Sequence, residues 1–385
     1  MLGHYHNMMK LITTAAMLVC AVSLTAQVPP TAVFTKGEDG IDTYRIPAIV
    51  KAGDGTLLAF AEARRNSASD TGDIDLVLKR SSDGGRTWSA AITVWDDDEN
   101  VCGNPSPVVD RNTGRIILLS TWNKGSDTEK KIHARTSKDT RRIYVQFSDD
   151  NGMSWSVPKE ITDQVKLPEW TWYATGPCHS IQLRSGRILV PCNHGVFEDG
   201  PAGTHSHVVY SDDHGETWHI GGDAGTGNES TVTELSNGDV MLNMRGTQDK
   251  DRELSGYARI VAISHDGGLS FDAPYWERQL IEPVCNASIC NFSKGAKPSR
   301  HLAFSNPCDG AKRRNMTLQV SPDNGRTWTK ASILSTWPSA YSDVVMMGDG
   351  SVGVLYENGK KGPYEKISFV TVSKKQVRKA LKKAR

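Results

Sequence analysis

Tight turns and short apolar runs alternate along the chain from Gly53 to Tyr356. A turn made of Gly, Asn or Asp and followed by apolar residues predicts a hairpin turn and the strand that leaves it. Six such units occur: GDGTLLAF (53–60), NTGRIILLS (112–120), RSGRILVPC (184–192), SNGDVMLNM (236–244), KPSRHLAFS (297–305) and GDGSVGVLY (348–356). Apolar residues at helical spacing do not recur over any length between them, so the pattern predicts an all-β protein.

A second motif, Ser-x-Asp-x-Gly-x-Thr-Trp, alternates with these units and occurs five times with small changes. The copies are SSDGGRTW (81–88), SDDNGMSW (148–155), SDDHGETW (211–218), SHDGGLSF (264–271) and SPDNGRTW (321–328). Each follows a strand-like run, and the central aspartates are 67, 63, 53 and 57 residues apart. Aspartate accepts hydrogen bonds from turn amides, glycine permits a positive φ, and tryptophan packs under a turn. We therefore interpret the motif as a structural turn, with a calcium or sugar site as the less favoured alternative.

The two repeats together predict the architecture. Each of the first five turn-strand units precedes one boxed turn, which favours a six-bladed β-propeller of four-stranded antiparallel sheets. The last unit, from about Ser339 to Ser373, lacks the motif, and we expect Ala32–Thr35 to add an outer strand that closes the ring. No linker interrupts residues 27–385, so we expect one domain with a short basic tail, a solvated helix or frayed end, over residues 374–385.

The N-terminus has the pattern of an export signal. Lys10 precedes the apolar run LITTAAMLVCAVSLTA, and Ala26 offers a small-residue cleavage site before Gln27. A buried strand or membrane anchor is the alternative, but the run is short for a spanning helix. Residues 1–26 therefore predict a signal peptide and a secreted or periplasmic protein without stable membrane insertion. Val19 before Cys20 is a poor lipidation signal, so a lipid-anchored form is not expected.

The balance of charged residues limits the kinds of molecule that the protein can bind. The chain has 45 Lys and Arg against 44 Asp and Glu, a net charge of +1, which argues against a nucleic-acid binder. A near-zero total still permits a local cluster of arginines that binds a small anion.

Six of the seven cysteines follow the signal peptide. Cys285 and Cys290 are the best candidates for a local disulfide, with buried free thiols as the alternative.

The boxed turns resemble the Asp-boxes of sialidases, and YRIP (44–47) resembles the RIP motif that opens that family. The resemblance extends from Phe34 to Val372. Other propellers and non-catalytic sugar-binding proteins also contain Asp-boxes, so the charged residues outside the boxes decide the activity. Sialic acid carries a carboxylate on its anomeric carbon, which arginine binds through two parallel hydrogen bonds. Sialidases use a tyrosine as nucleophile, and it needs a neighbouring carboxylate to accept its proton.

The resemblance implies three arginines that bind the substrate carboxylate. Arg45 in YRIP matches the first, and Arg245 lies at the end of the strand-like run GDVMLNMR. The family pattern Arg-x-Asn-x-Thr selects Arg313 as the third, with Arg314 and Lys312 as alternatives.

The catalytic residues implied by the resemblance lie elsewhere in the chain. Tyr341 in SAYSDVV matches the nucleophile, and Glu229 precedes Arg245 by 16 residues, as expected of the base. Glu234 is the rival base. Asp70, in a Ser- and Gly-rich stretch, matches the acid.

Several neighbours of these residues are weaker candidates. Asp73 and Asp75 near Asp70 are interpreted as strand or turn residues. Arg64, which is followed by Arg65, resembles an additional family arginine near the sugar 4-hydroxyl.

Some aromatic and polar residues are further candidates for the pocket wall, namely Trp170, Trp172, Tyr173, Asn104 and Pro105. We expect no catalytic metal, because four histidines lack the carboxylate spacing of a zinc site: His179, His194, His205 and His207. No cofactor is expected.

The resemblance as a whole implies an exo-α-sialidase. Such an enzyme removes terminal sialic acid from sialylated glycans with retention of configuration, and we expect it to be a monomer. Two alternatives stay open at this point: a non-catalytic carbohydrate-binding Asp-box propeller, and a trans-sialidase on the same fold.

Overall fold

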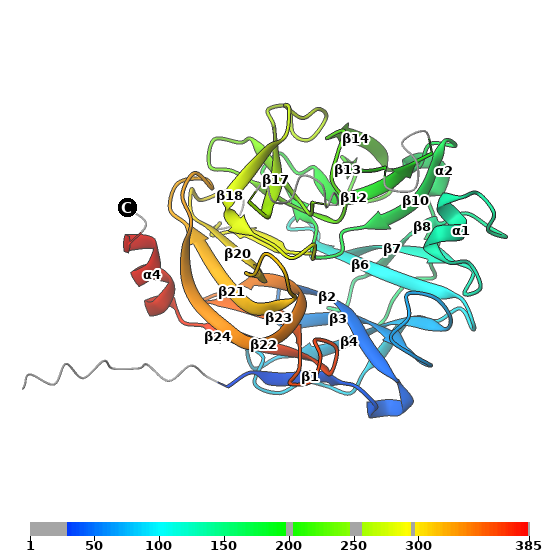
Figure 1. Cartoon of the computed structure of the whole chain (residues 1–385), viewed down its shortest axis with the longest axis horizontal. Helices are drawn as coiled ribbons and strands as arrows, with labels where there is room; N and C mark the ends of the chain where they lie inside the picture. Colours follow the sequence, from blue (N-terminus) through cyan, green and yellow to red (C-terminus); the bar gives the residue numbers. More distant parts are fainter. Residues whose placement is uncertain (1–28, 198–202, 247–255, 294–296, 384–385) are drawn as a thin grey trace, which may run out of the picture.

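The structure, a computed structural model, describes residues 29–197, 203–246, 256–293 and 297–383. The predicted signal peptide, residues 1–26, lies outside these ranges. The described residues form an all-β fold with a few short helices (Figure 1). The helices are η1 (Glu38–Gly40), α1 (Glu129–His133), α2 (Thr162–Val165) and α4 (Lys374–Lys383). None of the helices within these ranges has the length and apolarity needed to cross a bilayer.

The first sheet has eight strands from the N-terminal part of the chain. They are β2 (Thr43–Lys51), β3 (Leu57–Arg64), β4 (Ile74–Ser81), β5 (Ile92–Trp95), β6 (Val101–Val109), β7 (Ile116–Asn123), β8 (Arg142–Ser148) and β9 (Lys159–Glu160). Their order is β2-β3-β4-β6-β7-β8-β9, with β5 paired to β4. A parallel contact between Ile74 and Val101 joins its two antiparallel halves.

The central part of the chain forms two smaller antiparallel sheets. The five-stranded sheet contains β10 (Trp170–Thr175), β11 (Ile181–Gln182), β12 (Ile188–Val196), β13 (Thr204–Ser211) and β14 (His219–Asp223). The four-stranded sheet contains β15 (Ser230–Glu234), β16 (Val240–Met244), β17 (Ala258–Ser264) and β18 (Tyr275–Ile281).

The last sheet has seven strands and brings the two ends of the chain together. It contains β1 (Thr31–Thr35), β19 (Ser288–Asn291), β20 (Leu302–Pro307), β21 (Arg314–Ser321), β22 (Thr329–Met346), β23 (Val352–Asn358) and β24 (Lys366–Val372). The N-terminal β1 pairs antiparallel with β24 at its edge, so Ala32–Thr35 takes the outer position expected from the sequence.

The expectation of a six-bladed propeller of four-stranded sheets is wrong, because hydrogen bonding divides the described strands into sheets of eight, five, four and seven strands. Two connections account for the difference: the parallel contact between Ile74 and Val101 joins two groups into the eight-stranded sheet, and β22 is a single strand of 18 residues. Its first part pairs with β21 and its second part pairs with β23, so two hairpin groups become one sheet. The boundary expected near Ser339 therefore falls inside a continuous strand. Turn residues identify where hairpins reverse, but they do not show where a strand continues from one group into the next.

The five boxed motifs form the turns expected of them. In the third copy, Ser211 Oγ accepts a hydrogen bond from the Gly215 amide at 2.8 Å and donates one to Asp213 Oδ1 at 2.8 Å. Asp213 in turn accepts bonds from the amide and hydroxyl of Thr217. Gly215 has a φ of 88°, and a Cβ there would approach Ile117. The turn thus needs glycine for its backbone and fixes the hairpin against the neighbouring strand β7.

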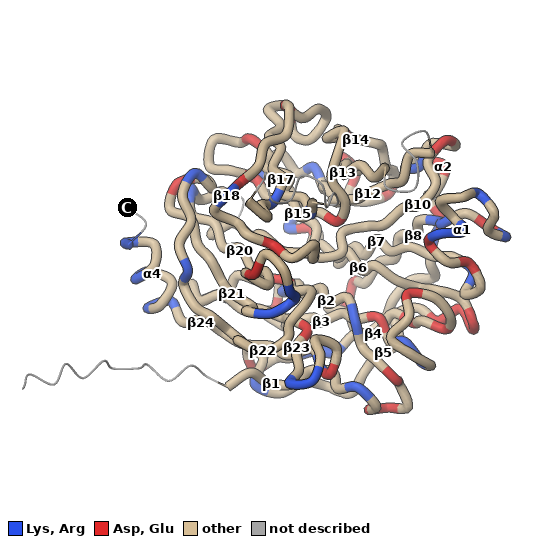
Figure 2. The backbone as a smooth tube through the Cα atoms, in the orientation of Figure 1, with Lys and Arg blue, Asp and Glu red and all other residues tan. Residues whose placement is uncertain are grey.

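The core lies between neighbouring sheets and continues under the C-terminal helix. Val377, Ala380 and Leu381 of α4 are buried against β21 and β22, so the tail is a packed helix rather than a solvated one. Its lysines and arginine stay on the outside, whereas both charge signs are distributed over the rest of the chain (Figure 2). Five of the six described cysteines are buried and all six are free, so Cys285 and Cys290 form no disulfide.

The boxed turns should contribute measurably to stability. Replacing Ser211 with Ala leaves the buried Gly215 amide without its acceptor, so we expect the free energy of unfolding to fall by about 1–3 kcal/mol. Urea unfolding followed by tryptophan fluorescence measures this change. Ser126→Ala, at an exposed position, is the control and should change the value by less than about 0.5 kcal/mol. Equal stability of the two variants would contradict the role of the turn.

Candidate active site

A cavity of about 270 Å³ brings together residues from distant parts of the chain. All seven residues proposed from the sequence line it: Arg45, Arg64, Asp70, Glu229, Arg245, Arg313 and Tyr341. They come from or directly follow β2, β3, β16 and β22, or lie in the connections between strands. The sequence assigned these residues as a group, and the fold places them around one space.

Irregular strand pairing aims several of these side chains into the cavity. The register shifts between Arg45 and Ala48 in β2 and between Ser339 and Ser342 in β22. Similar shifts in β6 and β10 bracket Asn104 and Trp172, which also line the cavity. A bulge bends its strand and redirects the side chains beside it. The cavity is therefore built where regular pairing is interrupted.

Tyr341, Glu229 and Arg245 form a compact hydrogen-bonded group. The Tyr341 hydroxyl donates a short hydrogen bond to Glu229 Oε1, and Arg245 Nη1 lies 2.6 Å from Glu229 Oε2 and 3.2 Å from Tyr341 Oη. Burial and the Glu229 carboxylate raise the pKa of Tyr341 well above its ordinary value, although three nearby arginines oppose this. The phenol is consequently protonated at neutral pH, and Glu229 is positioned to accept its proton.

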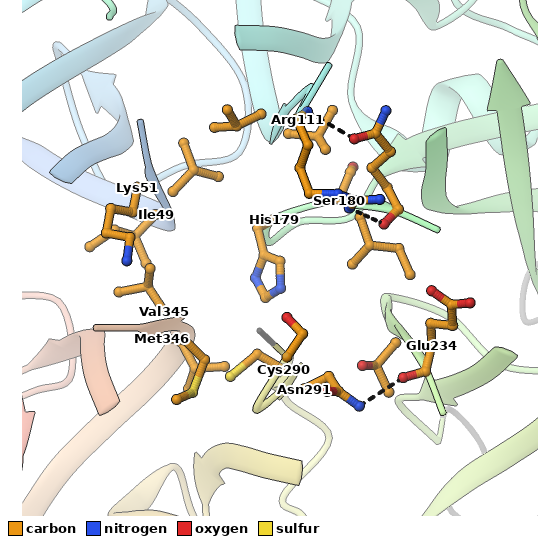
Figure 3. A pocket seen from close by; sticks show the side chains of 18 of the residues that line it. Ile49, Lys51, Arg111, His179, Ser180, Glu234, Cys290, Asn291, Val345 and Met346 are labelled. Carbon is orange, nitrogen blue, oxygen red and sulfur yellow. Dashed lines mark hydrogen bonds between the residues drawn. The ribbon is translucent and has the colours of Figure 1, made fainter. Parts of the chain in front are cut away.

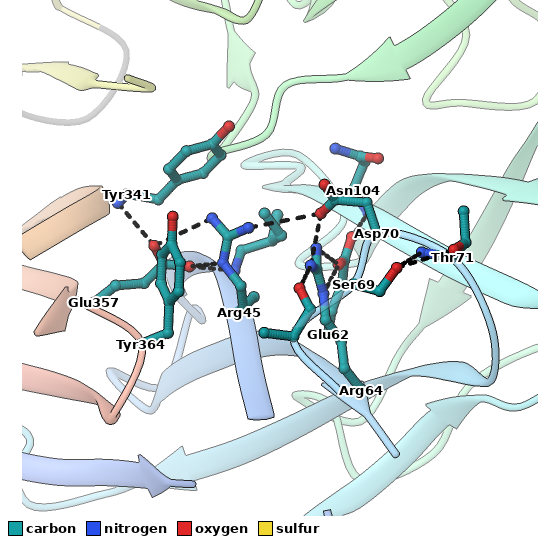
Figure 4. A network of polar contacts seen from close by, with 12 residues as sticks. Arg45, Glu62, Arg64, Ser69, Asp70, Thr71, Asn104, Tyr341, Glu357 and Tyr364 are labelled. Carbon is teal, nitrogen blue, oxygen red and sulfur yellow. Dashed lines mark hydrogen bonds and ion pairs between the residues drawn. The ribbon is translucent and has the colours of Figure 1, made fainter. Parts of the chain in front are cut away.

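Arg45 is held beside the tyrosine by a buried carboxylate (Figure 4). Glu357, which is fully buried, accepts bonds from Arg45 Nε at 3.1 Å and Nη2 at 3.4 Å. The same carboxylate accepts the backbone amides of Ile46 at 2.9 Å and Tyr341 at 3.0 Å. The Arg45 guanidinium lies 5.0 Å from the centre of the Tyr341 ring. One carboxylate therefore fixes the positions of both the arginine and the tyrosine.

Arg64 and Asp70 form an ion pair on the side of Arg45 that faces away from Glu357 (Figure 4). Glu62 accepts bonds from Arg64 Nε at 3.0 Å and Nη2 at 2.7 Å, which leaves Nη1 facing Asp70 Oδ1 at 2.6 Å. Asp70 Oδ1 also lies 3.6 Å from Arg45 Nη1 (Figure 4). Partial desolvation beside the cavity raises the pKa of Asp70, but Arg64 and Arg45 outweigh this effect and hold the pKa below its ordinary value. Asp70 is therefore ionised in this state and occupies the arginine cluster.

The structure separates Arg313 from its alternative. Arg313 donates to the Tyr364 hydroxyl at 3.0 Å and to the Val284 carbonyl at 2.9 Å, and its guanidinium lies 5.4 Å from the centre of the Tyr341 ring. Arg314 is half-exposed and pairs with Asp309 at 2.6 Å. Only Arg313 of the two lines the cavity.

The other rival residues have partners elsewhere. Arg65 pairs with Asp75 at 2.6 Å and with Asp73 at 3.2 Å. Glu234 pairs with Arg184 at 3.3 Å. Glu234 also lines a second cavity of about 370 Å³, where His179 projects toward the middle (Figure 3).

The second cavity has two cationic residues in its lining, Lys51 and Arg111, and not the cluster of arginines, carboxylates and a phenol that lines the first cavity. His179 Nδ1 lies 2.7 Å from the buried Asp343, and much of the remaining wall comes from apolar residues such as Ile49 and Val345. The arginine-lined cavity is therefore the candidate active site.

The sequence did not identify some residues that shape the cavity, namely Glu62, Glu129, Arg141, Asn228, Glu357 and Tyr364. The sequence did contain a signal for Glu62, because it lies two positions before Arg64 in the same strand and alternate strand residues share a face. No sequence signal pointed to Glu357 or Tyr364, since their roles depend on contacts between distant parts of the chain. Among the candidate aromatic residues, Trp172 lines the cavity and stacks 4.0 Å from the Arg141 guanidinium.

The predicted pocket-wall residues Trp170 and Tyr173 are instead buried in the core between sheets. Asn104 lines the cavity, and Pro105 is not part of its lining. One group of described residues has donor atoms suited to a metal ion, His194, His205 and Asp223, and it lies outside the cavity lining.

Comparison with known proteins identifies the family. Residues 55–354 match the BNR repeat-like domain family. A sialidase of Micromonospora viridifaciens is 33% identical over 335 residues, covering 84% of this chain and 51% of that protein. An exo-alpha-sialidase of Aspergillus fumigatus is 30% identical over 346 residues, covering 83% and 79% respectively. The solved structure of the Hadza microbial sialidase Hz136 superposes with a TM-score of 0.79 at 30% identity, covering 90% of this chain and 68% of that one.

The chain therefore belongs to the sialidase family of BNR repeat-like proteins. It spans about half the length of the Micromonospora relative.

The buried Glu357 should be essential to the site and to stability. Glu357→Ala removes the buried carboxylate that binds Arg45 and leaves it only the exposed Asp70 at 3.6 Å, so we expect a loss of about 3–5 kcal/mol in the free energy of unfolding. Chemical denaturation measures it, with the exposed Glu169→Ala as the matched control. A change of less than about 1 kcal/mol in the Glu357 variant would contradict the role assigned to this carboxylate.

Proposed function

We propose that this protein is an exo-α-sialidase, a glycoside hydrolase that releases terminal sialic acid from sialylated glycans with retention of configuration. The observation that carries the proposal is the contact of Tyr341 with Glu229 and Arg245, in a cavity that also holds Arg45 and Arg313. A non-catalytic sugar-binding protein has no need of a tyrosine hydrogen-bonded to a partly buried carboxylate.

The proposed reaction begins with binding of the substrate carboxylate by Arg45, Arg245 and Arg313. Asp70 then donates a proton to the glycosidic oxygen, while Tyr341 Oη attacks the anomeric carbon and passes its proton to Glu229. The bond to the aglycone breaks as the bond to Tyr341 forms. In the second half, Asp70 accepts a proton from water as the water attacks the anomeric carbon. Glu229 returns its proton to the departing tyrosine oxygen, and sialic acid leaves as the α anomer.

The free state of Asp70 fits this sequence of events. A general acid must be protonated, yet Asp70 is ionised beside Arg64 and Arg45. A substrate carboxylate bound to Arg45 neutralises the positive charge of this guanidinium and adds a negative charge near Asp70. Both effects raise the pKa of Asp70, so substrate binding itself favours the protonated acid.

We also propose that the protein is exported, because residues 1–26 have the pattern of a signal peptide.

The first test is turnover of a fluorogenic sialoside by wild type and Tyr341→Phe. We expect cleavage by wild type and a loss in kcat on the order of 10²-fold or more in the variant, because phenylalanine provides no nucleophile. Binding of sialic acid, measured by calorimetry, should change little. An inactive but folded wild-type protein would rule out the enzyme and leave the sugar-binding alternative.

Product analysis in the same assay separates hydrolysis from transfer. Proton NMR should detect the α anomer of free sialic acid first, and added lactose should not become sialylated. Sialyllactose as the main product would identify a trans-sialidase instead.

The acid role of Asp70 predicts a dependence on the leaving group. Asp70→Ala should lower kcat/KM for sialyllactose by about 10²–10⁴-fold, because the sugar alkoxide needs a proton to leave. The loss should be much smaller for an aryl sialoside, whose phenolate leaves without full protonation. Equal losses for the two substrates would contradict general-acid catalysis by Asp70.

The carboxylate-binding role predicts a difference between two adjacent arginines. Arg313→Ala should lower kcat/KM by about 10- to 100-fold, the loss of one or two charge-assisted hydrogen bonds. Arg314→Ala is the matched control, since Arg314 pairs with Asp309 outside the cavity, and should change kcat/KM by less than about twofold. The reverse pattern would show that Arg314, and not Arg313, is the third arginine that binds the substrate carboxylate.

A further inference from the structure

Four side chains on the five-stranded sheet form a cluster outside the active-site cavity. His194 of β12 lies directly opposite His205 of β13, and His207 lies opposite Asp223 at the end of β14. Cross-strand partners and residues two apart share one face of a sheet, so all four side chains meet there. The donor atoms of His194, His205 and Asp223 all lie within 4.8 Å of one another.

The His194 ring is held in one orientation. It stacks on Trp170 with ring centres 3.6 Å apart and an angle of 10° between the planes. Its Nδ1 lies 3.0 Å from His207 Nδ1, and His207 Nε2 lies 3.1 Å from the Tyr173 hydroxyl. The hydrogen bond at Nδ1 turns the other nitrogen, Nε2, toward Asp223. This resembles the way outer hydrogen bonds orient histidines that bind metal ions.

The Nε2 atom of His194 is the unusual feature of the cluster. It is buried and has no hydrogen-bond partner, although the His194 side chain is only 1% exposed. Asp223 Oδ2 faces it at 3.7 Å, too far for a hydrogen bond. A buried ring nitrogen of His194 and the Asp223 carboxylate thus face each other without a hydrogen bond between them.

The spacing suits a tetrahedral metal ion. Zinc binds imidazole nitrogen and carboxylate oxygen at about 2.0–2.2 Å, so two of its ligand atoms lie about 3.3 Å apart. Asp223 Oδ2 lies 3.2 Å from His205 Nδ1 and 3.7 Å from His194 Nε2. Two imidazoles and one carboxylate favour zinc-like ions, whereas calcium and magnesium prefer oxygen ligands throughout. The side chains of Asp223 and His205 are 38% and 23% exposed, which gives the ion a path from solvent.

We propose that His194, His205 and Asp223 bind one divalent transition-metal ion of the zinc class, with His207 as the residue that orients His194. Three protein ligands leave a fourth position for water. The ion would join the ends of three neighbouring strands.

The same region supports the chain that leads to Glu229. After Asp223, the Ala224 amide bonds to the Ser206 carbonyl at 2.9 Å, and Ser206 also bonds to Thr226 and Asn228. The role of the ion is structural, because none of its ligands lines the arginine cavity.

Metal binding by the full chain without an affinity tag tests this proposal. The protein is stripped with a chelator and titrated with Zn²⁺ in competition with a chromophoric chelator. Replacement with Co²⁺ gives a visible absorption spectrum that reports tetrahedral coordination. His205→Ala and Asp223→Asn remove single ligands at partly exposed positions. His265→Ala is the matched control, since His265 is exposed and lies 2.9 Å from Asp239 and 3.1 Å from Asp272, outside the cluster.

We expect one equivalent of Zn²⁺ to bind wild type and the His265 variant with equal affinity. Both cluster variants should bind at least about tenfold more weakly and lose the tetrahedral Co²⁺ spectrum. Failure of wild type to retain an equivalent of Zn²⁺ would overturn the proposal, and so would unchanged affinity in both cluster variants. No sialoside is used, so the result is independent of the proposed enzymatic activity.

Discussion

The architecture of the site depends on holding five guanidinium groups close together before any anion binds. Like charges at this distance repel, and burial makes each of them harder to accommodate. Three of the five are paired with carboxylates: Arg45 with Glu357, Arg64 with Glu62 and Arg245 with Glu229. The other two bond to neutral oxygens, Arg313 to those of Val284 and Tyr364 and Arg141 to those of Asn104, Thr121 and Asn123. The carboxylates lie behind or beside the arginines, which leaves positive groups facing the cavity.

Two of these carboxylates have second tasks. Glu357 also fixes the backbone amide of Tyr341, so the anion-binding arginine and the tyrosine move as one unit. Glu229 binds Arg245 and the Tyr341 hydroxyl together. Compensation of charge and positioning of the phenol are therefore achieved by the same side chains. A site built this way is rigid before substrate arrives, and Asp70, whose side chain is 71% exposed, is the charged group most able to move.

The sequence predicted much of this arrangement, and its failures have physical causes. The strand-and-turn repeats predicted the all-β class and the boxed turns, because both depend on local residues such as Gly215. The predicted number of sheets was wrong, since neither the continuity of β22 through Pro338 nor the parallel contact between Ile74 and Val101 has a local signal.

The seven charged and phenolic site residues came from the family resemblance and its motifs. Glu357 and Tyr364 escaped notice because their importance arises only when β23 and the segment after it fold against β2. The cluster of His194, His205, His207 and Asp223 was not predicted from the sequence for a related reason. Its members are spread over β12, β13 and β14, and only the strand register brings them together.

The most direct test of the account is to identify the residue that becomes bonded to the sugar. A sialosyl donor with fluorine at the anomeric carbon and at C3 reacts to form the intermediate but slows its hydrolysis, because the C3 fluorine destabilises the oxocarbenium-like transition state. Mass spectrometry of the digested protein should then find one sialosyl group, on the peptide that contains Tyr341. A sialosyl group on Asp70, Glu229 or any other residue would contradict the central claim that Tyr341 is the nucleophile.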